Sequence, residues 1–201
     1  MLKRAFDASL AAAGLVLSAP LWTLIATAIK LEDGGPIFYR QQRVGLGGRP
    51  FDAMKFRSMR PDAEAMTGAI QATEDDPRVT RVGRIMRATA MDELPQLWNI
   101  LRGDMSFVGP RALRPGEIEA EGDGRVTRLE DVPGFERRIS VRPGLTGLAQ
   151  IYARRDVPRR QKFRYDRVYV DRHSWWLDVR LILLSFWISF RGTWEARGRK
   201  Y

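Results

Sequence analysis

The sequence contains no cysteine and a single histidine, His173. The absence of cysteine excludes disulfide bonds, thiol catalysis and zinc sites built from thiolates. One histidine is enough for a Ser-His-Asp triad, but no G-x-S-x-G motif accompanies it. Any bound metal is therefore expected to be a hard cation held by carboxylates and ligand phosphates, most simply Mg²⁺.

Negative charge is also scarce. The chain has 201 residues, of which 34 are Lys or Arg and 24 are Asp or Glu, so its net charge is +10. Such an excess predicts an anionic partner, which can be nucleic acid, anionic lipid head groups or a phosphorylated ligand. The length suits one domain with a substantial hydrophobic core.

Residues 8–29 contain no charged side chain. A straight helix of that length would measure about 33 Å, enough to cross a hydrocarbon core of about 30 Å. Pro20 lies near the middle, where a proline removes a hydrogen bond and clashes with the preceding turn. Split there, the halves would be about 18 Å and 16 Å long, and each would reach only half way across.

We therefore predict that residues 1–33 form a re-entrant membrane hairpin bent near Pro20, and that residues 34–201 form a compact cytoplasmic catalytic domain. Basic residues flank the apolar segment on both sides, and the positive-inside rule then places both ends in the cytoplasm. The flanking residues are Lys3, Arg4, Lys30, Arg40 and Arg43.

Three other interpretations of this segment stay open. Membrane helices tolerate proline, so the segment can be a kinked spanning helix. Residues 26–28 read Ala-Thr-Ala and imitate a signal-peptide cleavage site, although Asp7 and the length of the apolar region argue against a cleaved signal. The segment can also be a buried helix of a soluble domain.

The rest of the chain predicts a mixed α/β fold that is mostly helical, with short strands and interfacial helices. Turn residues, proline and hydrophobic periodicity place the elements. We expect strands at 37–39 and 51–56 around a turn at 45–48, a helix followed by a loop within 62–76, helices at 78–87 and 93–101, and a turn at 142–147.

Near the C-terminus, tryptophans bracket an apolar run at residues 181–190. Ten residues cannot span a bilayer, but such a segment can lie at its interface with tryptophans at head-group depth. A core helix explains the same pattern equally well. The tryptophans are Trp175, Trp176, Trp187 and Trp194.

Asp92 and Glu93 stand at the start of the predicted helix at 93–101, which Gly103 ends. Asp92 there fits an N-cap that complements the helix dipole. The same position suits a catalytic carboxylate, because helix N-terminal amides hold anions and phosphates. The turn at 109–111 can likewise be structural, or its Arg111 can grip a phosphate.

Taken together, the motifs resemble those of the bacterial sugar transferases, the monotopic polyprenyl-phosphate phosphoglycosyl transferases. The resemblance covers almost the whole chain, and its strength lies in the order and spacing of the motifs. They read KRAFD at 3–7, KFRSM at 55–59, DPRVTRVG at 76–83, DELPQ at 92–96, GDMS at 103–106, VGPR at 108–111, RPGLTG at 142–147, YD at 165–166 and LD at 177–178.

The resemblance implies an enzyme that moves a sugar-1-phosphate from a UDP-sugar to polyprenyl (undecaprenyl) phosphate and releases UMP. This reaction would be the first membrane step of glycoconjugate or exopolysaccharide synthesis. The resemblance also implies the bacterial inner (plasma) membrane, with the catalytic domain on its cytoplasmic face. The chain is similar to the minimal catalytic form of the family.

The same resemblance implies roles for particular residues. Asp92 would attack the sugar-bearing phosphate and form an aspartyl-phosphosugar intermediate. Glu93 would hold Mg²⁺ together with Asp92, or tune the acceptor. Substrate binding would fall to Lys55, Arg87, Arg111 and Asp166.

Two alternatives belong to other classes. The +10 charge alone also fits a nucleic-acid-binding module, which leaves the apolar N-terminus and the acidic pair unexplained. A membrane scaffold without activity fits the apolar segments but does not need Asp92. We expect anionic membrane lipids rather than nucleic acid as partners, while the transferred sugar and the oligomeric state stay open, so an oligomer is allowed.

Overall fold

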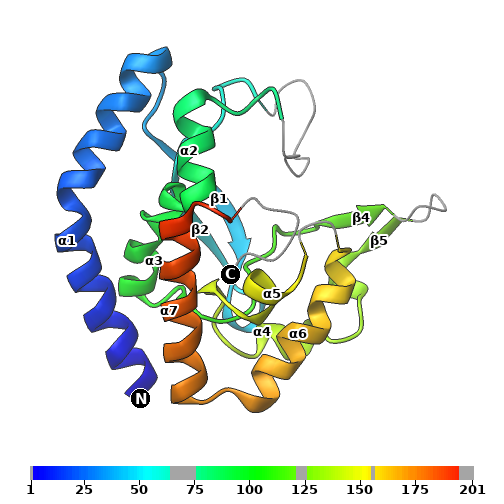
Figure 1. The fold of residues 1–201 in the computed structure, drawn as a ribbon. Helices are drawn as coiled ribbons and strands as arrows, with labels where there is room; N and C mark the ends of the chain where they lie inside the picture. Colours follow the sequence, from blue (N-terminus) through cyan, green and yellow to red (C-terminus); the bar gives the residue numbers. More distant parts are fainter. Residues whose placement is uncertain (1, 64–75, 121–125, 155–156, 195–201) are drawn as a thin grey trace.

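A computed structural model of the chain describes residues 2–63, 76–120, 126–154 and 157–194 (Figure 1). Its helices are α1 (Leu2–Asp33), α2 (Arg81–Thr89), α3 (Gln96–Arg102), α4 (Phe135–Ile139), α5 (Leu148–Tyr152), α6 (Arg159–Arg172) and α7 (Trp175–Arg191). Its strands are β1 (Phe38–Val44), β2 (Pro50–Phe56), β3 (Ser106–Val108), β4 (Ile118–Ala120), β5 (Val126–Arg128) and β6 (Gly144–Thr146). Short 3₁₀ helices are η1 (Leu46–Gly48), η2 (Met91–Glu93) and η3 (Leu129–Asp131). The prediction of a mixed, mostly helical α/β fold is confirmed.

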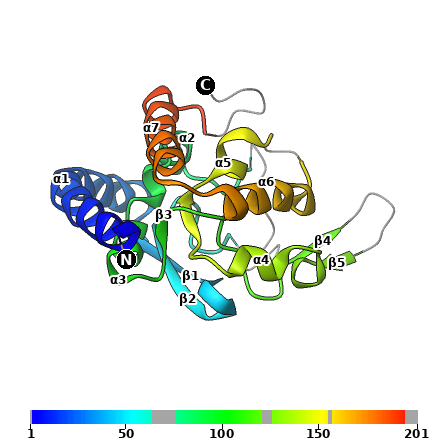
Figure 2. The same cartoon turned by 90° about the horizontal axis from the view of Figure 1, so that it is seen from below.

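Helix α1 lies along one side of the molecule, next to α3 (Figures 1 and 2). Its inner face buries Ala11, Ile25 and Ile29. Gly14 allows close approach, because a Cβ there would lie 3.2 Å from a methyl carbon of Leu97. By length and composition, α1 is the one helix among the described residues that is long and apolar enough to cross a membrane. Its outward side exposes Val16, Leu17, Leu24 and Leu31.

The helix is not broken at Pro20, because α1 passes through this residue as one helix, which curves along its length (Figure 1). Pro20 is exposed. Two residues later, Trp22 packs inward, with ring centroids 5.2 Å from Phe56 and 6.0 Å from Phe38. Packing on both sides of Pro20 therefore offsets the free-energy cost of the lost hydrogen bond. The prediction from the sequence considered that cost without the packing.

The start of α1 is built into the body by buried hydrogen bonds. Asp7 is 2% exposed, and its carboxylate accepts bonds from Ser106 Oγ at 2.8 Å and from the Phe107 backbone N–H at 3.3 Å. Asp178 of α7 forms an ion pair with Lys3 and lies 2.8 Å from the Tyr169 hydroxyl. We call this set the N-terminal network: Lys3, Asp7, Ser106, Phe107, Tyr169 and Asp178.

The end of α1 is attached to the same body. The Glu32 carboxylate accepts bonds from the backbone N–H groups of Arg81, at 2.6 Å, and Val82, at 3.1 Å, so it caps α2. Asp33 forms an ion pair with the buried guanidinium of Arg57. Both ends of the apolar helix are therefore held by one folded unit.

Strands β1 and β2 form an antiparallel hairpin in which Phe38 pairs with Phe56 and Val44 with Pro50. This confirms the two predicted strands and the turn between them, although β1 runs further than residues 37–39. The predicted helix at 78–87 is confirmed as α2, which starts later, after Thr80 as its N-cap. Most of the segment 62–76, where a helix and a loop were predicted, lies outside the described residues.

The segment 142–147 was predicted as a turn, but part of it is strand β6, which pairs in parallel with β3. Gly109 and Gly144 allow the two segments to touch. A Cβ on Gly144 would lie 2.0 Å from the Gly109 nitrogen, and a Cβ on Gly109 would lie 2.4 Å from the Arg142 carbonyl oxygen. The glycines of the VGPR and RPGLTG motifs are thus packing contacts between distant segments.

Helix α7 is consistent with both interpretations of the C-terminal segment, as a core helix and as an interfacial helix. Leu181, Ile182 and Ile188 are buried in the core. Trp176, at 80% exposed, and Phe190, at 84%, point away from the core. Figures 1 and 2 place α7 on the same side of the molecule as α1, away from the β4–β5 hairpin.

Candidate active site

The acidic pair lies in a short turn between α2 and α3 rather than on a helix start. Ala90 takes the left-handed conformation with φ 57°, and the 3₁₀ helix η2 follows. Helix α3 begins only at Gln96, and Pro95 occupies its N-cap position without a side-chain bond. The prediction that Asp92 caps a helix is therefore wrong. Gly103 does end the helix, with φ 97°, as predicted.

Asp92 is 8% exposed. Within the described part of the chain, no hydrogen bond to its carboxylate is found. Burial raises its pKa from 3.8 to about 6, and the negative charge of Glu93 adds to this rise, while the ammonium of Lys55 opposes it. Although most of the residue is buried, its carboxylate oxygens are not fully enclosed, so they stay accessible to a ligand.

In contrast to Asp92, Glu93 is stabilised in its ionised form. Its carboxylate forms an ion pair with the Lys55 ammonium and lies 3.3 Å from Nη2 of Arg111. Burial works against ionisation, but Lys55 and Arg111 outweigh it and lower the pKa of Glu93 to about 2. Two adjacent carboxyl groups therefore differ sharply in proton affinity, which is typical of functional sites.

Lys55 is positioned by the contact between β2 and α3. The side chain of Asn99, 1% exposed, donates to the Asp52 carbonyl at 2.7 Å and accepts from the Met54 backbone N–H at 3.0 Å. This amide ties the strand to the helix one residue before Lys55. Sequence reasoning missed Asn99, although an amide on the inner face of a short helix beside the acidic pair is a usable signal.

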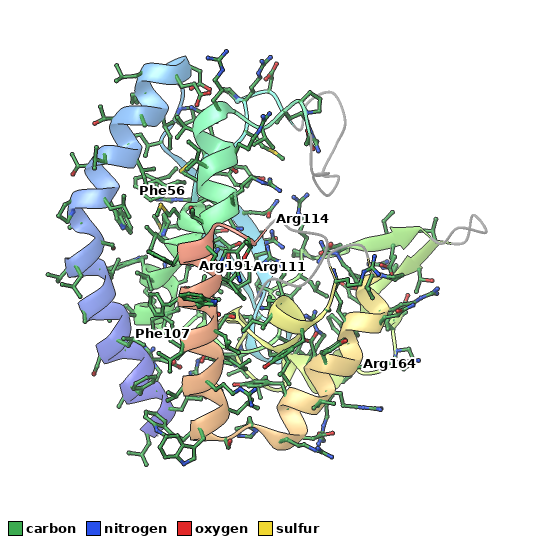
Figure 3. All side chains as sticks on the ribbon, in the orientation of Figure 1. Phe56, Phe107, Arg111, Arg114, Arg164 and Arg191 are labelled. Atoms are coloured by element: carbon green, nitrogen blue, oxygen red, sulfur yellow. The ribbon has the colours of Figure 1, made fainter. Side chains whose placement is uncertain are left out.

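Arg111 follows β3 and lies beside Gly144 in an isolated parallel bridge. Its side chain is 43% exposed, so one side of the guanidinium faces Glu93 and the rest is open to a ligand. Figure 3 shows Arg111 and Arg114 in the middle of the molecule, between the α1 side and the β4–β5 hairpin. The structure thus brings together Lys55, Asp92, Glu93 and Arg111 from three separate segments.

The other two predicted site residues lie further out. Arg87 is half-buried in the last turn of α2, and its charge lowers the pKa of Asp92. Asp166 of α6 is 3% exposed and forms an ion pair with Arg138 of α4, at 3.2 Å. It does not reach the acidic pair directly, and its role in substrate binding stays a prediction.

Arg43 is a further residue near the site that the sequence reasoning treated only as a basic flank. It is 9% exposed, and burial lowers its pKa to about 10, with Arg111 and Arg114 adding to the effect through their charges. Strand alternation is the available signal, because Tyr39, Gln41 and Arg43 share the inner face of β1.

Mg²⁺ is compatible with these residues if a ligand supplies most of the coordination. Among the described residues, no group of three or more Asp, Glu or His side chains gathers to form a protein-only metal site. Mg²⁺ usually binds through one or two carboxylates plus substrate phosphates and waters. The Asp92 carboxylate, with free acceptor capacity beside Glu93, fits that mode.

Comparison with known proteins places these features in a family. The model of the family described as "Bacterial sugar transferase" matches residues 1–192. An "Undecaprenyl-phosphate glucose phosphotransferase" of Komagataeibacter xylinus is 43% identical over 91% of this chain and 35% of its own length. The chain thus spans about a third of that relative.

Two further relatives are covered more fully. A "UDP-glucose:undecaprenyl-phosphate glucose-1-phosphate transferase" of Caulobacter vibrioides is 45% identical over 90% of this chain and 67% of the relative. The "Exopolysaccharide production protein PSS" of Rhizobium leguminosarum bv. phaseoli is 41% identical over 90% of this chain and 92% of the relative.

Proposed function

Because the chain belongs to the bacterial sugar transferase family, we propose that it transfers a sugar-1-phosphate from a UDP-sugar to polyprenyl phosphate. The names of its relatives favour UDP-glucose as donor and undecaprenyl phosphate as acceptor. The observation that carries the proposal is the acidic pair. A donor-free Asp92 lies beside a Glu93 that is neutralised by Lys55 and Arg111.

In the first step, a carboxylate oxygen of Asp92 attacks the sugar-bearing phosphorus of the UDP-sugar. The bond from that phosphorus to the bridging oxygen breaks, and UMP leaves with the electron pair. With a pKa of about 6, Asp92 is mostly ionised at neutral pH and available for attack. In the second step, the lipid phosphate attacks the same phosphorus, and the bond to Asp92 breaks to restore the carboxylate.

The basic residues hold the anionic substrates. Arg111 and Lys55 already lie against Glu93, and Arg87 approaches from α2, so a diphosphate can bridge them beside Asp92. Mg²⁺, held by Asp92 or Glu93 together with the diphosphate oxygens, would neutralise charge on the leaving phosphate.

We also propose that the outward apolar surfaces of α1 and α7 contact lipid. Both ends of α1 are attached to the same folded unit, through the N-terminal network and through Glu32, which supports placing both ends on one side of the membrane. That is the topology expected of the hairpin, here with a curved helix that continues through Pro20 (Figure 1). The basic flanks favour the cytoplasmic face of the inner membrane and contact with anionic lipids.

The activity is tested by incubating the purified protein with polyprenyl phosphate, Mg²⁺ and a series of UDP-sugars, and by following UMP. UDP-glucose should give the fastest release. Labelled UDP-glucose without the lipid should leave label on Asp92. No UMP from any UDP-sugar, or label on another residue, would contradict the proposal.

The topology is tested with single cysteines, which the cysteine-free chain allows without background. Leu2→Cys and Leu46→Cys occupy exposed positions at the first residue of α1 and beyond its end. In inside-out membrane vesicles, a membrane-impermeant thiol reagent should label both. Labelling from opposite faces would show a spanning helix.

A further inference from the structure

Four consecutive backbone carbonyls around Arg111 are each held by a donor from elsewhere in the fold. Two donors are backbone N–H groups and two are arginine side chains, at distances between 2.7 and 2.9 Å. The pairs are Gly144 N to Pro110 O, Arg138 Nη2 to Arg111 O, Arg43 Nη1 to Ala112 O, and Val44 N to Leu113 O.

Both arginines are buried and carry their own partners. Arg138 is 6% exposed, bonds Asp166 through Nε at 3.2 Å, and lies 4.5 Å above the Phe163 ring. Arg43 is 9% exposed and bonds the Gln41 side chain. Burial lowers the pKa of both guanidinium groups, yet both stay ionised at neutral pH.

Burying two guanidinium groups is an expensive way to stabilise a fold, because apolar side chains of similar size usually serve as well. Their forked geometry does something that an apolar side chain cannot do. One guanidinium group can donate hydrogen bonds to an acidic or amide side chain and to a backbone carbonyl at the same time. One of the two carbonyls belongs to Arg111, whose side chain faces Glu93. The other belongs to the next residue, Ala112.

We propose that Arg138 and Arg43 are positioning residues that fix the backbone of Arg111 and Ala112, and so hold the Arg111 guanidinium where the diphosphate binds. Asp166 then acts as the counter-charge of Arg138 rather than as a ligand of the substrate. The inference rests on the proposed function for its catalytic consequence. Small displacements of a phosphate-binding group reduce turnover strongly, so backbone positioning has a large effect.

The test replaces the buried pair as a unit, by Arg138→Leu with Asp166→Leu. Removing both charges together avoids an unpaired buried charge, so the melting temperature should fall less than in Arg138→Leu alone. The value of kcat/KM for UDP-sugar should fall about 10- to 100-fold. In an Arg111→Ala background the same change should alter kcat/KM by less than about twofold, because the pair acts through Arg111.

A matched control is a second ion pair between the same two helices, whose arginine is the residue next to Arg138. Arg137 and Asp171 form an ion pair between α4 and α6, but both are exposed, at 58% and 42% of their side chains. Arg137→Gln with Asp171→Asn should leave kcat/KM within about twofold of the wild type. Normal turnover in the leucine pair, or an equal loss in the Arg111→Ala background, would overturn the proposal.

If the leucine pair does not fold, Arg138→Lys replaces it. Lysine keeps the charge beside Asp166 but cannot also reach the Arg111 carbonyl in the same fork. Loss of turnover in a folded Arg138→Lys supports positioning, and wild-type turnover overturns it. If the wild type turns over no UDP-sugar, the proposed function has failed; the same variants are then compared by calorimetric titration with inorganic pyrophosphate, where unchanged affinity overturns the positioning role.

Discussion

Asp7 and Asp92 are both buried aspartates, 2% and 8% exposed, yet the surrounding structure treats their carboxylates differently. In the N-terminal network, each oxygen of Asp7 and of Asp178 has a bonding partner. In the active site, Asp92 receives no hydrogen bond from the described residues, although cations lie nearby.

Asp7 belongs to the enclosed polar groups that native proteins nearly always satisfy, whereas the carboxylate oxygens of Asp92 are not fully enclosed and can meet a ligand. The N-terminal network anchors α1 and closes the hydrogen-bonding requirements of its own members. The active site leaves one carboxylate open and gives its neighbour the cations. An aspartate carboxylate therefore anchors a helix in one region and is available for reaction in another.

The sharpest test of this contrast is Asp92→Asn. It should lower kcat about 10³-fold or more, because the nucleophile is lost. Its melting temperature should stay close to that of the wild type, since the carboxylate has no bond to lose. UMP release and thermal melting measure the two effects. A non-catalytic scaffold predicts normal function for this variant, and substantial activity would remove Asp92 from its role.

Asp7→Ala should show the reverse pattern. It leaves the Ser106 hydroxyl and the Phe107 N–H buried without an acceptor, so the free energy of unfolding should fall by about 2–4 kcal/mol. Turnover per folded molecule should be nearly normal at low temperature. Denaturant titration in detergent, paired with an assay at 10 °C, separates these quantities. A stable Asp7→Ala protein that has lost turnover would break the comparison.

Lys55→Met probes the cation between the two carboxylates. It should lower kcat/KM about 10- to 100-fold, because a preorganised charge is lost from the phosphate site. The remaining activity should be measured between pH 5 and pH 8. An unchanged rate would mean that Arg111 alone holds the diphosphate.

The pH profile follows from Asp92. Its pKa is raised from 3.8 to about 6, so the wild-type rate should fall below pH 6 as the nucleophile becomes protonated. Protonation is favoured in the folded state, so this group stabilises the protein in acid and loses that contribution as the pH rises through 6. Lys55→Met should move the acid limb of the profile to higher pH, because Lys55 lowers the pKa of Asp92. A flat profile from pH 5 to pH 7 would exclude Asp92 as the titrating group.

The smallest effect is expected at the exposed edge of the N-terminal network. The Lys3 side chain is 38% exposed, and its partner Asp178 keeps the Tyr169 hydroxyl after the change. Lys3→Met should therefore cost only about 0.5–1 kcal/mol of unfolding free energy. A loss above about 2 kcal/mol would show that the ion pair is as important as the buried bonds of Asp7.

Local patterns in the sequence predicted what depends on neighbouring residues. The β1–β2 hairpin, helix α2 and the helix end at Gly103 all follow from turn residues and periodicity. The motif order also singled out Lys55, Asp92, Glu93 and Arg111, which the structure brings together. Contacts between distant segments were not visible, such as the parallel pairing of β3 with β6 through Gly109 and Gly144.

The errors have the same origin. Pro20 predicted a break because the cost of a proline is local, whereas the packing of Trp22 that offsets it is tertiary. Asp92 fits a capping pattern by composition, but the left-handed Ala90 starts a 3₁₀ turn that moves the helix start to Gln96. The substrate-binding role of Asp166 stays a prediction, and its burial against Arg138 becomes visible only in three dimensions.

The anchoring of α1 has a consequence for biosynthesis. During synthesis, the hydrogen-bond partners of Asp7 are made 99 and 100 residues later in the chain. Asp178, the partner of Lys3, is made 175 residues later. At a translation rate of about 5–20 residues per second, Lys3 would be without its partner for about 10 to 35 s. During that interval the first helix leaves the ribosome with an apolar surface and an unsatisfied carboxylate. A nascent chain stalled before residue 178 should therefore be more sensitive to protease at α1 than the finished protein.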